Sequence, residues 1–182
     1  LTGTLSGFVA ADNVTATYSR TAGETVAGSP YTVSATLSPA GALVNYTVTN
    51  NTANFTITQA TPTITVTPGT YTYNGAAQGP LATDVNTGGS TGAITLSYVG
   101  TGTTAYGPSA TAPTAAGTYT VTASVAADGT YNAATSGATA FTIGAKAASV
   151  TPTAASKTFG AVDPTLTGTL SGFVAADNVT AT

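Results

Sequence analysis

Acid–base or metal chemistry in this sequence rests on six carboxylates, because the chain has no His and no Cys. Without those two residue types, a Ser-His-Asp triad, a Cys-His pair and an ordinary zinc site are all excluded. Asp84 and Asp128 each stand beside a turn, so we interpret them as turn-capping residues and not as a general acid–base pair. Asp12 and Asp163 are candidates for a calcium site, but no Asp-x-Asp spacing supports one. We predict no catalytic, cofactor-binding or metal-binding residue.

The basic residues are equally few. Arg20, Lys146 and Lys157 are too few cations to neutralise the phosphates of a nucleic acid, so no nucleic-acid partner is expected. Arg20 and Glu24 flank a turn and are expected to pair across it. Lys157 is either a solvated side chain or the lysine of an intramolecular Lys–Asn crosslink.

Asn-x-Thr sequons offer modification sites, although in a Thr-rich chain they also arise by chance. They occur at Asn13, Asn45, Asn50, Asn54 and Asn178. Thr-rich surfaces are also candidates for O-linked sugar.

The composition explains why reactive residues are scarce. Of 182 residues, 43 are Thr, 35 Ala and 21 Gly, whereas only 5% are charged. No run of 18 apolar residues predicts a membrane span. Regularly recurring Val, Ile, Tyr and Phe argue against disorder. A cytosolic protein with so little charge would have poor colloidal protection, which favours an extracellular or bacterial cell-surface location.

The sequence repeats itself. Residues 1–17 recur letter for letter as residues 166–182, which sets a period of 165 residues. We expect the parent protein to continue in both directions with further copies.

A second, diverged repeat lies inside this period and predicts two modules. Three markers return in the same order 84 to 88 residues later: Tyr31–Ala35 as Tyr119–Ala123, Phe55–Ile57 as Phe141–Ile143, and Val66–Pro68 as Val150–Pro152. We assign residues 1–60 to the later part of a module A whose first strands are missing. Residues 61–144 form a complete module B, and residues 145–182 open the next module A.

Period-two alternation predicts short strands separated by Gly, Asn and Pro turns, with helix expected nowhere. In module B the expected strands are Thr63–Thr67, Thr70–Tyr73, Leu81–Val85, Ala93–Val99, Thr118–Val125 and Thr139–Ile143. Their spacing of about ten residues is typical of a β-sandwich. We predict an all-β fold of tandem immunoglobulin-like sandwich modules in a linear repeat array.

One segment resembles the strand of immunoglobulin domains that carries a corner tyrosine. Tyr119 stands two residues before Val121, which takes the place of the second core cysteine, and Tyr31 and Val33 repeat the arrangement in module A. These four residues are predicted to be structural, with the Tyr119 hydroxyl bonded to backbone a few residues upstream. The alternative is an ordinary edge strand that carries a tyrosine.

Module A resembles the bacterial MBG-type repeat. The resemblance lies in Lys157–Phe173, Asp12–Val14, Ser19–Glu24, Tyr31–Val33, Asn45–Val48 and Phe55–Ile57. Module B, through Tyr73–Gly79 and Ala116–Ala123, resembles bacterial immunoglobulin-like repeats of giant surface proteins. The resemblance implies extracellular adhesins or surface fibres without catalytic residues, and a β-grasp-like fold as the alternative for module A.

We interpret the chain as a structural segment of a long extracellular fibre or adhesin stalk, and not as an enzyme. Its expected partners are neighbouring repeats, with lateral self-association into fibres. One alternative is that the repeats bind glycan or a host surface directly. In that case exposed tyrosines would serve as the contacts, but these tyrosines are also candidates for the core: Tyr71, Tyr73, Tyr98, Tyr106 and Tyr131.

A second alternative is a fibre subunit that polymerises by donor-strand exchange. A neighbour's residues 146–165 would then supply the missing first strands of module A. The duplication of residues 1–17 argues against this alternative, because the donor would bring a redundant copy of them.

Overall fold

The computed structural model describes residues 1–181, and the predicted all-β class is confirmed. The chain forms two compact units. Unit 1 comprises Leu1–Thr61 with Ala127–Asn132, and unit 2 comprises Pro62–Ala126 and the chain from Ala133 onward.

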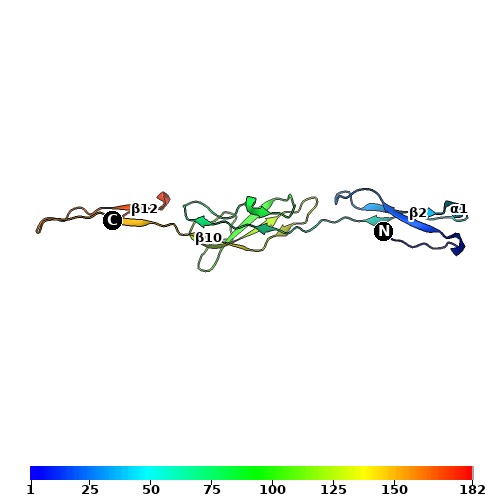
Figure 1. The fold of residues 1–182 in the computed structure, drawn as a ribbon, viewed down its shortest axis with the longest axis horizontal. Coiled ribbons are helices and arrows are strands. Elements are labelled where there is room, and N and C mark those ends of the chain that lie inside the picture. The colour runs from blue at the N-terminus through cyan, green and yellow to red at the C-terminus, as the bar shows by residue number, and fades with distance from the viewer. Residues whose placement is uncertain (182) are drawn as a thin grey trace. The chain divides into compact units, whose positions relative to one another are not determined.

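Unit 1 is built on a three-stranded antiparallel sheet. Its strands are β1 (Thr15–Arg20), β2 (Tyr31–Ser38) and β3 (Ala53–Phe55), in that spatial order. Along β1 and β2 exposed residues alternate with less exposed ones, because successive side chains of a strand point to opposite faces. The one-turn helix α1 (Ala40–Leu43) follows β2, and both are labelled in Figure 1.

The loop 127–132 belongs to unit 1 through backbone contacts with the end of that unit. The Ala60 amide donates to the Thr130 carbonyl at 3.0 Å, and the Asn132 amide donates to the Ala60 carbonyl at 2.8 Å. These bonds form an isolated parallel bridge between Ala60 and Tyr131.

The core of unit 2 lies on a five-stranded sheet. Its main path runs β5 (Tyr71–Thr72), β10 (Thr139–Gly144), β8 (Gly117–Val125) and β7 (Ile94–Gly100), and β9 (Ala134–Thr135) also pairs with β8. A second, two-stranded sheet joins β4 (Thr65–Val66) to β6 (Val85–Asn86). Alternate residues of β8 are fully buried, from Tyr119 to Val125, and pack with Phe141 and Ile143 of β10.

Unit 2 ends in an antiparallel hairpin of β11 (Ser149–Pro152) and β12 (Gly168–Ser171), drawn in orange to red in Figure 1. Its apolar side chains are largely uncovered. Val150 of β11 is 55% exposed, and Phe159 and Val162 in the connecting segment are almost completely exposed.

Two secondary-structure predictions were wrong. Leu81–Val85 is not a strand, because the Asp84 carboxylate accepts the Leu81 amide at 2.7 Å and closes the 3₁₀ turn η2 (Ala82–Asp84) ahead of β6. Helical turns also occur where none was expected, in α1, η1 (Ala10–Asp12), η2 and η3 (Ala175–Asp177). All of them are three or four residues long, so they need no apolar stripe of helical period.

Candidate functional site

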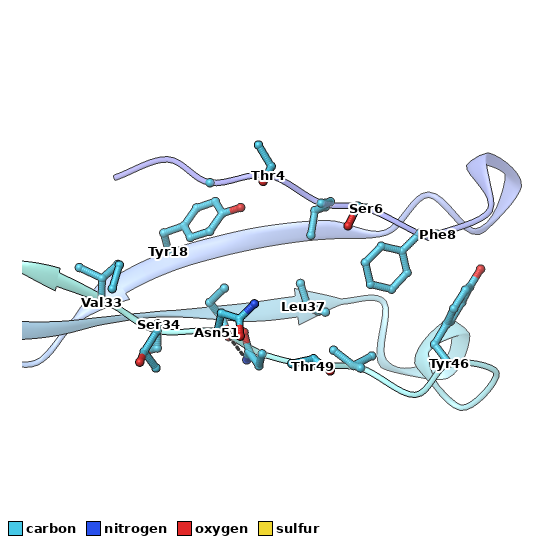
Figure 2. Close-up of a pocket in the computed structure, with 18 of the residues that line it drawn as sticks. Thr4, Ser6, Phe8, Tyr18, Val33, Ser34, Leu37, Tyr46, Thr49 and Asn51 are labelled. Carbon is cyan, nitrogen blue, oxygen red and sulfur yellow. Dashed lines mark hydrogen bonds between the residues drawn. The ribbon is translucent and has the colours of Figure 1, made fainter.

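A groove of about 590 Å³ lies in unit 1, between its first residues and the segment that follows α1. Figure 2 shows Thr4 and Ser6 on one side, Thr49 and Asn51 on the other, and Tyr18 and Leu37 between them. Tyr18 comes from β1, and Val33 and Leu37 come from β2, so the sheet forms the floor. The floor is therefore partly aromatic and aliphatic, whereas the sides are rich in Thr, Ser and Asn.

One end of the groove is held by Tyr46. Its ring packs edge-to-face on Phe8, with ring centroids 4.9 Å apart. Its hydroxyl accepts the Val9 amide at 3.0 Å and donates to the Asp12 carboxylate. The bond to Asp12 raises the pKa of Tyr46 above its ordinary value, because a phenolate could no longer donate to the carboxylate.

The two copies of the repeated sequence share their local conformation. Gly7 and Gly172 have φ values of 80° and 82°, and Asn13 and Asn178 have φ values of 48° and 49°. In each copy the asparagine follows a 3₁₀ turn of Ala-Ala-Asp. The aspartate differs in its partner: Asp12 accepts from Tyr46, whereas Asp177 accepts from Tyr73.

Residues 3–6, on the side of the groove, belong to no strand. The structure of residues 1–181 pairs no backbone with them as a sheet neighbour. Gly3 lies directly on the Tyr18 ring, since a Cβ added to Gly3 would stand 2.6 Å from the Tyr18 Cε1 atom.

Tyr31 of β2, predicted to be structural, is buried beneath the loop that precedes it. Its hydroxyl donates to the Thr25 carbonyl and accepts the Thr25 amide, both at 2.9 Å. Gly23, at φ 143°, makes room for the ring, because a Cβ there would stand 2.1 Å from the Tyr31 Cε1 atom. Val33 is half-buried and lies between Arg20 of β1 and Ala53 of β3 in register.

Arg20 lies over two aromatic rings, a role that sequence reasoning missed. Its guanidinium carbon is 5.1 Å from the ring centroid of Tyr31 and 4.8 Å from that of Phe55. The expected ion pair with Glu24 is present as well. The register Tyr31↔Phe55 places the two rings side by side, and the sequence alone does not specify that register.

In unit 2 the corresponding tyrosine is Tyr119 of β8. Its hydroxyl donates to the Ala115 carbonyl at 2.8 Å, which is the upstream backbone bond that we expected. Val121 is completely buried, beside Ala123 in the core cluster. Burial raises the pKa of Tyr119, because desolvation disfavours the phenolate.

The other singled-out tyrosines of unit 2 serve mainly as core and turn residues. Tyr98 is buried and donates to the Pro80 carbonyl at 2.5 Å, while Tyr71, Tyr73 and Tyr106 pack against the same core. Tyr131, in the loop 127–132 of unit 1, takes part in the bridge to Ala60.

Asp84 and Asp128 behave as turn-capping groups, as predicted. Asp84 accepts from Leu81, and Asp128 accepts the amides of Thr130 and Tyr131, both at 2.7 Å. Asp163 forms an ion pair with Lys157. Within residues 1–181 there is no group of three or more Asp or Glu residues that could hold a metal ion.

No helix among the described residues is long and apolar enough to cross a membrane. No curated protein and no solved structure matches the chain.

One family model does match part of the chain. Residues 148–182, about a fifth of the sequence, match the MBG domain (YGX type). The matched stretch contains the β11–β12 hairpin and η3. Since residues 166–182 are identical to residues 1–17, the similarity to an MBG domain extends to the sequence that begins unit 1.

Proposed function

We propose that this chain is a structural segment of an extracellular bacterial surface protein, a stalk or fibre built from alternating β modules. The observation that carries the proposal is the recurrence of residues 1–17 as residues 166–182, inside a stretch similar to an MBG domain. MBG domains are repeat domains of adhesin-like proteins and are not a known enzyme family. A repeated module whose polar side chains form hydrogen bonds within its own turns is suited to separating and linking other parts of a protein.

The strand order of unit 2 supports an immunoglobulin-like module over residues 61–144. The sequence β7–β8–β10 corresponds to the C–F–G sheet of such sandwiches, with Tyr119 and Val121 on the F-like strand. β4 pairs with β6, whereas the next strand, β5, pairs with β10 of the larger sheet. Consecutive strands near the start of unit 2 that belong to different sheets also suit a sandwich.

The surface chemistry favours a structural role over a catalytic one. Asp84 and Asp128 accept hydrogen bonds within their own turns, Asp12 accepts one from Tyr46, and Asp163 pairs with Lys157. With only nine charged residues in 182, the contacts of this surface should depend little on salt.

The proposal is tested by microscopy and labelling on the source bacterium. Antibodies raised against the purified chain should label intact cells. Isolated fibres should show an axial repeat of roughly 70–80 Å, because strands of seven or eight residues at about 3.3 Å each, with their loops, make modules roughly 35–40 Å long and each period holds two modules. Labelling only after the cells are opened would contradict the surface location. Globules without an axial repeat would contradict the stalk.

Direct ligand binding is tested separately with the same purified chain on a glycan array. A stalk segment should give no signal above that of a charge-matched control protein. Saturable binding to a defined glycan would replace the stalk proposal with an adhesin that binds through its repeats.

A further inference from the structure

One asparagine of the chain is followed by glycine. Asn74 and Gly75 lie in the exposed turn after β5, and every other asparagine precedes a residue that carries a Cβ atom. Asparagine is among the thermolabile residues of proteins. Because glycine has no Cβ atom, its backbone amide nitrogen approaches the side-chain carbonyl carbon of the preceding asparagine without steric hindrance. That approach is the first step of deamidation.

The turn holds the Asn74 side chain in place and leaves the attacking nitrogen free. The Asn74 Oδ1 atom accepts the Ala76 amide at 2.9 Å. The Gly75 amide donates no hydrogen bond within residues 1–181. Residues 74–77 are all exposed, so water and hydroxide reach them. The oxygen that must carry negative charge during the reaction therefore already has a backbone donor, which stabilises that charge.

Backbone hydrogen bonds on both sides separate this turn from the core of unit 2. The Tyr73 amide donates to the Gly144 carbonyl, and the Gln78 amide donates to the Pro113 carbonyl, both at 2.8 Å. Residues 74–77 lie between these two bonds and belong to no strand. A covalent change in such an exposed segment disturbs the fold less than one inside a paired strand.

We propose that Asn74 is a site of spontaneous deamidation, which converts it to aspartate and isoaspartate while unit 2 stays folded. Hydroxide removes the Gly75 amide proton, and the nitrogen forms a bond to the Asn74 Cγ atom. The bond between Cγ and Nδ2 breaks, and ammonia leaves with a proton taken from water. The product is a succinimide ring. Water then opens the ring at one carbonyl to give aspartate, or at the other to give isoaspartate.

Asn86 provides an internal comparison. It is exposed, and its Oδ1 atom accepts the Gly88 amide at 2.9 Å, which is the same kind of bond that Asn74 makes with Ala76. The residue after it is Thr87, whose β-branched side chain crowds its own amide nitrogen. The two sites therefore share the side-chain bond and differ in the attacking residue, so Asn74 reacts faster.

The modification changes the charge of a chain that has very little. Each conversion adds one negative charge to a formal net charge of −3, so the surface becomes more acidic as the protein ages. This inference goes beyond the proposed surface role and does not depend on it, because the reaction needs only the turn, water and hydroxide.

Incubation of the purified full chain in mildly alkaline buffer tests the proposal. Chymotrypsin cleaves after tyrosine and leucine, so it releases Asn74 in residues 74–81 and Asn86 in residues 82–96, each as the single asparagine of its fragment. Mass spectrometry follows the exchange of the amide group for a hydroxyl group, and isoaspartyl methyltransferase labels isoaspartate. Asn74 should convert at least about tenfold faster than Asn86. Its rate should rise in proportion to the hydroxide concentration.

Two substitutions test the role of the following residue. Gly75→Ala should slow the conversion of Asn74 by at least about tenfold. An alanine Cβ atom there would stand 2.8 Å from the Val174 Cγ1 atom, so circular dichroism must establish that this variant is folded. Thr87→Gly is the reciprocal change and should accelerate the conversion of Asn86 towards the rate of Asn74. This gain of reactivity gives a readout that does not depend on the folding of Gly75→Ala.

The aged wild-type chain should keep its circular dichroism spectrum and its unfolding midpoint, because the bonds of Tyr73 and Gln78 hold the chain on either side of the modified turn. Three results would overturn the proposal: conversion of Asn74 no faster than that of Asn86, no acceleration of Asn86 in a folded Thr87→Gly chain, or unfolding of unit 2 in step with the conversion.

Discussion

Gly7 and Gly172 adopt the same left-handed backbone conformation, yet only Gly172 is covered by another chain segment. The conformation is therefore set by the local sequence, which is identical around both residues. The covering segment is not needed to form the turn. The left-handed turn is therefore a property of the repeated sequence itself.

Val121→Ala should destabilise unit 2 by about 2 kcal/mol, since it removes two buried methyl groups from a packed core. Urea denaturation followed by circular dichroism measures the loss. Val99→Ala on the neighbouring strand β7 is the control, because Val99 is 37% exposed and should lose clearly less. Equal losses would show that the core of unit 2 does not centre on β8.

Tyr119→Phe should lower the free energy of unfolding by about 1 kcal/mol, because it removes the hydroxyl that donates to the Ala115 carbonyl and keeps the ring. Tyr106→Phe deletes an exposed bond to the Thr111 carbonyl and should have a smaller effect. A chemical-denaturation midpoint unchanged by Tyr119→Phe would show that the corner bond contributes nothing to stability.

Arg20→Lys should destabilise unit 1 by about 1 kcal/mol although the charge is kept. The planar guanidinium lies over Tyr31 and Phe55, and an ammonium group cannot stack in the same way. Lys157→Arg, at the exposed ion pair with Asp163, is the control and should leave the unfolding midpoint within error. If Arg20→Lys is equally silent, the aromatic contacts carry no stability.

Stability should fall in alkaline solution, and Tyr46 should contribute to the fall. Its pKa is raised in the folded chain, so the stabilisation is complete below its ordinary value of 10.0 and is lost as the pH rises through the raised value. Denaturation midpoints measured from about pH 9 to about pH 11.5 should decline less in Tyr46→Phe than in the wild type. Parallel declines would assign the effect to other tyrosines.

The sequence predicts a strand correctly where the alternation of apolar and polar residues is visible within the strand itself. The predicted strand Thr118–Val125 differs from β8 by one residue, because every second residue from Tyr119 to Val125 is apolar and buried. The predicted strand Leu81–Val85 was wrong, because a single hydrogen bond from the Leu81 amide to the Asp84 carboxylate stabilises a turn that the apolar pattern does not reveal.

The groove was not predictable in the same way. Tyr46 and Asp12 are 34 residues apart, and their hydrogen bond depends on how the segment after α1 returns to the first residues of the unit. The corner tyrosine was predictable because the Tyr119–Val121 spacing and the upstream bond to Ala115 lie within seven residues of chain.

The identity of Gly3–Ser6 and Gly168–Ser171 has a genetic consequence. Because residues 166–182 repeat residues 1–17, gain or loss of 165 residues by recombination between copies leaves the sequence at every junction unchanged. The length of such an array can change in a single event without any compensating mutation. Selection can then act on the length of the array alone, while the sequence at each junction stays constant.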